Sequence, residues 1–103
     1  MWAQLITTRL KAGHEADLPR LEEELRKTEQ PGSGLVRSLT MQDQKDPSKV
    51  YSLVVLESEE KARARESDPR REEGLQAARA VMAEIFDGPP DFVDLNVVTE
   101  FVP

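Results

Sequence analysis

The chain has 103 residues, of which 38% are hydrophobic and 33% charged, and its 14 Lys and Arg face 20 Asp and Glu for a formal net charge of −6. This length supports one domain, residues 1–103, and the acidic balance argues against non-specific nucleic-acid binding and against a polybasic membrane anchor, because both depend on clustered cations. The absence of cysteine excludes disulfides, thiolate catalysis and zinc–thiolate sites, and it fits the reducing cytoplasm, where we expect the protein.

The first half of the chain predicts a strand at 2–11, a helix at 15–29 and two strands at 35–42 and 50–56. Residues 2–11 are rich in β-branched and aromatic types, which favour a strand. The helix is predicted by leucines that recur at helical spacing, namely Leu18, Leu21 and Leu25. A short polar link joins the next two strands, so they are expected to form a hairpin.

The second half predicts a short helix within 57–68, a longer helix at 69–86 and a last strand at 92–102. Both charges are dense from 57 to 73, which is typical of solvated helix faces. Pro69 interrupts this run and suits a first helical position behind a capping Ser67 or Asp68. The longer helix is predicted by an apolar stripe at Leu75, Ala78, Met82 and Ile85.

The order βαββαβ predicts an α+β, ferredoxin-like fold, with a four-stranded antiparallel sheet and both helices on one of its faces. The strand at 50–56 is apolar on both faces, since Tyr51, Leu53 and Val55 alternate with other apolar residues. Two helices cover only one face, so we expect the other to pack on a second copy in a homodimer. The alternative is an open sheet with scattered apolar residues on its surface.

Three short motifs, together with this order, resemble the antibiotic biosynthesis monooxygenase family of the dimeric α/β barrel superfamily. They are Lys11-Ala12-Gly13, Val55-Leu56-Glu57-Ser58-Glu59-Glu60-Lys61-Ala62 and Phe86-Asp87-Gly88-Pro89-Pro90. The resemblance implies a sheet paired with a second subunit, which forms a dimeric α/β barrel, and a pocket between sheet and helices. Members of the family include cofactor-free oxygenases of phenolic or quinol compounds and haem-degrading enzymes.

The residues that the resemblance associates with haem degradation are missing here. Such relatives carry an Asn on the first strand, whereas the only Asn of this chain is Asn96, in the last predicted strand. They also carry a Trp and a His around the second helical region, where this chain has Leu56 and Arg70, while its single His is His14. We therefore expect no haem and no other cofactor. No carboxylate or histidine cluster shows metal-ligand spacing.

The candidate ligand-binding residues are polar or aromatic side chains on predicted strands, together with one arginine. They are Trp2, Gln4, Tyr51, Asp94, Asn96 and Arg70. A cofactor-free oxygenase needs a dry pocket with a few polar groups that orient and deprotonate the substrate. Each candidate has a structural alternative: the aromatic residues can anchor packing or a dimer seam, and the arginine can be solvated or contact an anion across the dimer.

The strands also offer Thr8, Ser38, Thr40 and Ser52 to a pocket, but which strand face lines it depends on the sheet register. Two functions remain open from the sequence. One is a cofactor-independent monooxygenase of an aromatic or quinol-type small molecule. The other is a non-catalytic dimeric barrel that binds a small apolar ligand or has an accessory or stress role.

Overall fold

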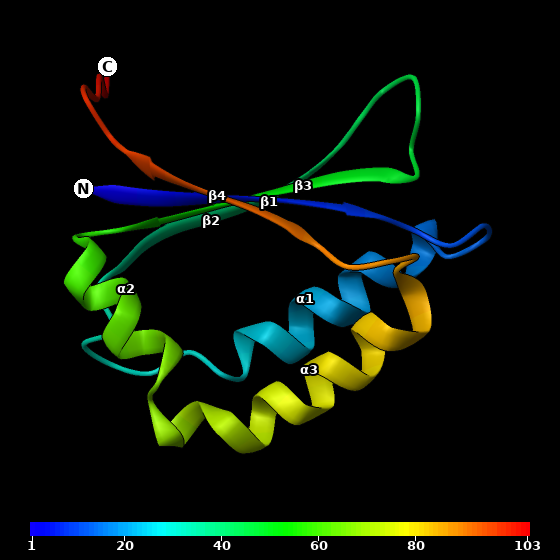
Figure 1. Cartoon of the computed structure of the whole chain (residues 1–103), viewed down its shortest axis with the longest axis horizontal. Helices are drawn as coiled ribbons and strands as arrows, with labels where there is room; N and C mark the ends of the chain where they lie inside the picture. The colour runs from blue at the N-terminus through cyan, green and yellow to red at the C-terminus, as the bar shows by residue number, and fades with distance from the viewer.

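The computed structural model describes all 103 residues and shows a four-stranded antiparallel sheet with three helices on one side (Figure 1). In chain order the main elements are β1 (Trp2–Arg9), α1 (Leu18–Arg26), β2 (Leu35–Gln42), β3 (Lys49–Leu56), α2 (Glu59–Glu66), α3 (Glu72–Ile85) and β4 (Asp91–Asn96). The strands lie in the order β2-β3-β1-β4. The predicted ferredoxin-like fold is confirmed.

Side-chain caps and a proline mark the helix starts, and the cap before the longer helix is one of the two predicted residues. The Asp68 side chain accepts from the backbone N–H of Arg70 at 2.9 Å and opens a single 3-10 turn, Pro69–Arg71, which leads into α3. The Ser58 hydroxyl caps α2 by accepting from the N–H of Lys61 at 3.1 Å. Pro19 lies in the first turn of α1, as its missing N–H requires. None of the helices is long and apolar enough to span a membrane.

The last strand is shorter than the predicted 92–102, because β4 pairs only with β1. Asn96 lies opposite Trp2, the first residue of β1, so a longer β4 would find no partner strand within the chain. Residues 97–103 continue without regular structure, and they leave Val98 and Phe101 almost fully exposed, at 89% and 87%. Apolar alternation continues past Asn96, but register decides where the strand ends.

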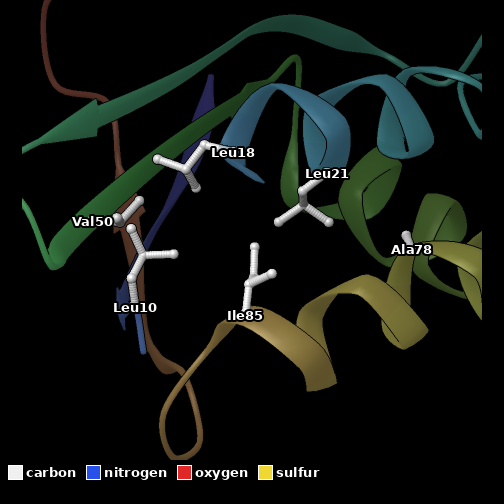
Figure 2. Close-up of a cluster of buried hydrophobic side chains, with 6 residues drawn as sticks. All are labelled: Leu10, Leu18, Leu21, Val50, Ala78 and Ile85. Carbon is white, nitrogen blue, oxygen red and sulfur yellow. The ribbon is translucent and has the colours of Figure 1, made fainter. Parts of the chain in front are cut away.

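Two separate apolar clusters join the helices to opposite ends of the sheet. The larger cluster packs α1 and α3 against the end of β1 and the start of β3 through Leu10, Leu18, Leu21, Val50, Ala78 and Ile85 (Figure 2). The smaller cluster packs α2 against the other end of the same two strands through Trp2, Leu56 and Ala62. The middle of the sheet lies between these clusters, beneath the helices.

No helix covers the opposite face of the sheet, which we call the outer face (Figure 1), and this face carries apolar side chains. Because side chains alternate along a strand, Tyr51, Leu53 and Val55 of β3 point away from the helices. The edge strands add residues that are 39% to 47% exposed: Leu39, Met41, Val93 and Leu95. The predicted two-sided apolar sheet is therefore present in the structure.

Candidate functional site

A cavity of about 640 Å³ lies between the sheet and the helices. Its 27 lining residues, 14 of them hydrophobic, come from all four strands and all three helices. This volume and this mixture are typical of small-molecule sites, which are mostly apolar with a few polar groups that fix orientation. The cavity is the candidate functional site of the chain.

Small polar side chains form much of the cavity floor. Ser52 of β3 pairs with Thr40 of β2 on one side and with Ile6 of β1 on the other, and all three line the cavity. One row along, Ser38 and Gln4 flank Val54 in the same way. Large apolar residues at these positions would have filled the space under the helices. The short side chains of the floor therefore leave room for the cavity, and their hydroxyl and amide groups make the floor polar.

Three carboxylates line the cavity, and they differ in their partners. Glu66 pairs with Arg63 at 3.1 Å, and Glu29 lies 3.5 Å from Arg65. Glu22, on α1, has no cationic partner, and its carboxylate accepts a hydrogen bond from the Thr40 hydroxyl on the floor. Glu22 is thus the lining carboxylate best suited to accept a proton from a bound molecule.

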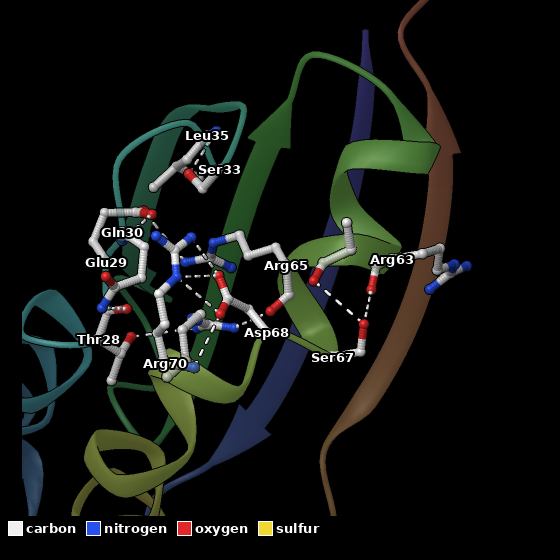
Figure 3. A network of polar contacts seen from close by, with 12 residues as sticks. Thr28, Glu29, Gln30, Ser33, Leu35, Arg63, Arg65, Ser67, Asp68 and Arg70 are labelled. Carbon is white, nitrogen blue, oxygen red and sulfur yellow. Dashed lines mark hydrogen bonds and ion pairs between the residues drawn. The ribbon is translucent and has the colours of Figure 1, made fainter.

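Two arginines, Arg65 and Arg71, line the end of the cavity where α2 meets the segment after α1, and Figure 3 shows Arg65 in the polar network of this region. Arg71 is buried, with 6% exposure, and donates to the backbone oxygen of Arg65 at 3.0 Å and to the Thr28 hydroxyl at 3.3 Å. The Arg65 guanidinium has a single polar partner, Oε2 of Glu29. We call Glu29, Arg65 and Arg71 the arginine cluster.

The arginine cluster perturbs two ionisable groups. Burial alone would raise the pKa of Glu29, but a hydrogen bond from Ser33, another from the Gln30 N–H at 3.0 Å and the charge of Arg65 together lower it. Burial, with the neighbouring charge of Arg65, lowers the pKa of the Arg71 guanidinium from its ordinary value. Arginine still keeps its charge at neutral pH, so the cluster holds two cations and one anion.

A second polar network borders the cavity at the β1–β4 edge. Asp94 accepts from the Gln4 amide at 3.0 Å and from Arg63 at 2.9 Å, and these two bonds hold the pKa of Asp94 below its usual range. The Arg63 guanidinium also lies over the Trp2 ring, 5.2 Å from its centroid. This network ties α2 to the edge strand and fixes the amide of Gln4 at the cavity wall.

The structure separates the six candidate residues into two groups. Trp2 and Gln4 line the cavity, and Asp94 holds Gln4 from just outside it. Tyr51 lies on the outer face, with the ammonium of Lys49 5.5 Å from its ring centroid. Asn96 is exposed at the end of β4 and does not line the cavity.

Arg70 also lies away from the cavity, because its guanidinium is bound to Asp68 at 2.7 Å. The same bond gives Arg70 an anionic partner within its own chain. All four strand hydroxyls expected to be available to a pocket do line it: Thr8, Ser38, Thr40 and Ser52.

The sequence did not predict the charged residues of the site. The run from 57 to 73 was interpreted as a solvated face, yet Arg65 is only 19% exposed in its side chain and Arg71 is buried. A local signal was present, since Arg71 lies two residues after Pro69, at the Asp68-Pro69 break between α2 and α3. Burial itself depends on Thr28, 43 residues earlier, which no local pattern links to Arg71.

No group of three or more His, Asp and Glu side chains is placed to hold a metal ion. The single histidine lies outside the cavity, where its Nδ1 contacts Asp17 Oδ2 at 2.7 Å.

No family model and no curated protein sequence matches the chain. Solved structures do match: a provisionally named antibiotic biosynthesis monooxygenase from Nitrosomonas europaea superposes with a TM-score of 0.75 at 13% identity, over 96% of this chain and 100% of that one. The chain has the fold of proteins named as antibiotic biosynthesis monooxygenases. A structure from Chloroflexus aurantiacus, provisionally given that name, has a TM-score of 0.67 at 21% identity, over 99% of this chain and 98% of that one. One from Bordetella bronchiseptica, also provisionally given that name, has a TM-score of 0.73 at 17% identity, over 95% of this chain and 97% of that one.

At these identities the likeness establishes the fold. It confirms, at that level, the resemblance inferred from the element order and the turn motifs. Another structure of the same fold, from Nitrosomonas europaea, is described as a protein of unknown function (TM-score 0.74, 18% identity, 99% and 93% coverage). The fold alone therefore does not name a substrate.

Proposed function

We propose that the chain is a cofactor-independent monooxygenase that oxidises an aromatic or quinol-type small molecule in the cavity between sheet and helices. The observation that carries the proposal is the cavity itself, which is large enough for a ring system and is lined by apolar side chains with hydroxyl, amide and carboxylate groups at a few positions. The shared fold with proteins named as monooxygenases supports it.

The proposed reaction needs a base and a site that excludes water. A CH₂ group activated by a phenolic ring loses a proton, and the carbanion passes one electron to O₂. The carbon radical and superoxide then combine to a peroxide anion, which takes the proton back from the base to give a hydroperoxide. Loss of water from the hydroperoxide leaves a carbonyl, so that CH₂ and O₂ become C=O and H₂O. The protein contributes deprotonation, orientation and an apolar environment, while the electron-rich substrate itself reduces the oxygen.

Glu22 is the proposed base. The other lining carboxylates, Glu66 and Glu29, contact arginines at 3.1 and 3.5 Å, and the lowered pKa of Glu29 makes it a weaker proton acceptor. Glu22 instead accepts a bond from the neutral Thr40 hydroxyl, which fixes its carboxylate at the floor without a countercharge. A substrate lying on that floor would present its acidic C–H to this group.

Oxygen uptake with a panel of anthrones and quinols tests this function. We expect uptake above the protein-free rate, with the ketone or quinone as product, and a fall of about 10²-fold or more in Glu22→Gln, in keeping with the contribution of a general base. Glu23→Gln is the matched control, because Glu23 is exposed and pairs with Arg26. No rate above the protein-free control with any member of the panel would refute the proposal.

We further propose that the active form is a homodimer, packed through the outer face. The exposed leucines and valines of β2 and β4 would leave a broad apolar patch in water, and a second copy of the same surface would bury it. The exposed apolar tail after β4 supports the same arrangement. Sedimentation at micromolar concentration is expected to give twice 11.6 kDa, and a monomer would overturn this part. We expect the dimer to act in the cytoplasm.

A further inference from the structure

We propose that the arginine cluster receives one carboxylate carried by the aromatic ligand of the cavity. The inference rests on the proposed function, which places an aromatic ligand in the cavity, and it goes further by stating that this ligand carries one negative charge. The observation that leads to it is a pair of guanidinium groups that line the cavity and each have a buried Nε without a hydrogen-bond partner.

Arg71 is held in place but is not fully bonded. Its two terminal nitrogens donate to the Arg65 backbone oxygen and to the Thr28 hydroxyl, which fixes the guanidinium between α2 and the end of α1. Its Nε is buried and has no hydrogen-bond partner. A buried N–H without an acceptor is costly, and because this Nε is closed off from the cavity in the structure, it gains a ligand acceptor when the guanidinium turns toward the ligand.

Arg65 has more donors to offer. Its nearest polar partner is Oε2 of Glu29 at 3.5 Å, which exceeds the normal range for a hydrogen bond, and its Nε is also buried and unpaired. A guanidinium has five N–H donors in a planar fork that matches a carboxylate. The Arg65 side chain lines the cavity and retains 19% exposure, so it can adjust toward a ligand oxygen.

The charge count favours a monoanion. Two arginines and the ionised Glu29 give the arginine cluster one net positive charge, which a single carboxylate neutralises. A dianionic phosphate would leave a net negative charge in a poorly solvated place. The lining carboxylate that has no cationic partner, Glu22, lies seven residues before Glu29, so the proposed base and the proposed anion site lie at different places along the cavity wall.

A pair of isosteric probes tests the proposal without any turnover. 2-Naphthoate and 2-naphthamide share the ring system and differ in charge, and calorimetry gives the affinity of each. We expect the carboxylate to bind at least tenfold more tightly. Arg65→Gln is expected to abolish that preference, and Arg65→Lys to restore part of it. Arg79→Gln removes the same charge from an exposed position outside the cavity and should leave the preference unchanged.

The arginine Nε–Hε signals in ¹⁵N NMR report the contact directly. We expect the Arg65 and Arg71 signals to move on addition of 2-naphthoate and to stay in place with 2-naphthamide, whereas a purely structural role would leave both unmoved in either case. Equal binding of the two probes, or unmoved signals, would overturn the anion site and leave the oxygenase proposal standing. Binding of neither probe would overturn the anion site and also count against the cavity as an aromatic site.

Discussion

Replacing Arg71 with methionine should destabilise the fold by removing the link between α2 and the end of α1. The change deletes the donor to the Arg65 backbone oxygen and the donor to Thr28. The Arg65 oxygen keeps a bond from the Asp68 N–H at 3.3 Å, so what is lost there is one hydrogen bond from a charged donor, which contributes about 1.5–3 kcal/mol. The Thr28 hydroxyl keeps its bond to the Leu25 oxygen at 2.6 Å, so its loss adds little. The variant also removes the unpaired Nε, which offsets part of the cost.

The expected decrease in the free energy of unfolding is therefore about 2 kcal/mol, out of the roughly 5–15 kcal/mol typical of a domain. For a chain of this size it corresponds to a drop in Tm of about 8–16 °C. Urea unfolding followed by circular dichroism measures the free energy, and a thermal scan measures the Tm. Arg79→Met, at an exposed arginine on α3, is the control and should stay within about 0.5 kcal/mol of the wild type.

A double-mutant cycle with Thr28→Val isolates the contact between the two elements. Because Arg71 donates to Thr28 across 43 residues of sequence, we expect a coupling energy of at least about 0.5 kcal/mol. A destabilisation below about 0.5 kcal/mol together with zero coupling would show that Arg71 behaves as an ordinary surface side chain. That result would refute the burial on which the arginine cluster is built.

Three further predictions concern the floor of the cavity, the outer face of the sheet and the stability of the fold at acidic pH. Ser52→Leu puts a large apolar side chain into the cavity, so the affinity for 2-naphthoate measured by calorimetry should fall at least tenfold, while the free energy of unfolding stays the same or rises. An unchanged affinity would show that the ligand binds elsewhere. Leu53→Glu puts a charge on the outer face and should give a monomer in sedimentation, and a persistent dimer would contradict the proposed interface. The Glu29 carboxyl should titrate by ¹³C NMR below its ordinary pKa of 4.5. Because its pKa is lower in the folded state, ionised Glu29 stabilises the fold above pH 4.5, and this stabilisation is lost as the pH falls through the folded-state pKa. The variant Glu29→Gln should lack this pH dependence of the free energy of unfolding. A titration midpoint of Glu29 above 4.5 would contradict the prediction.

Local chemistry was sufficient to predict most of the fold. The break at Asp68-Pro69, the hairpin between β2 and β3 and the strand alternation all depend on residues close in sequence, and all appear in the structure. The predicted end of β4 was wrong. The strand ends where its partner β1 begins, and this point is decided by the register between strands that are distant in sequence. The strand hydroxyls could be proposed as candidates, but their shared face required the same register.

The charged part of the site was beyond local reasoning for a different reason. Arg65 and Arg71 stand in a run where acidic and basic residues alternate, and such runs are usually solvated. Their burial comes from a helix end and a loop that meet only in the folded chain. Residues whose environment is made by tertiary packing carry no periodic signal of their own.

The division of the core into two clusters bears on how this scaffold can diversify. Apolar packing is concentrated at the two ends of β1 and β3, and the floor of the cavity lies between these ends, on β1, β3 and the neighbouring β2. Exchanges at Ser38, Thr40 or Ser52 change the shape and polarity of the cavity without removing a side chain from either cluster. Ligand preference can therefore drift by single substitutions while the strands that hold the floor stay anchored at both ends. For an engineer, these three positions are the first to randomise.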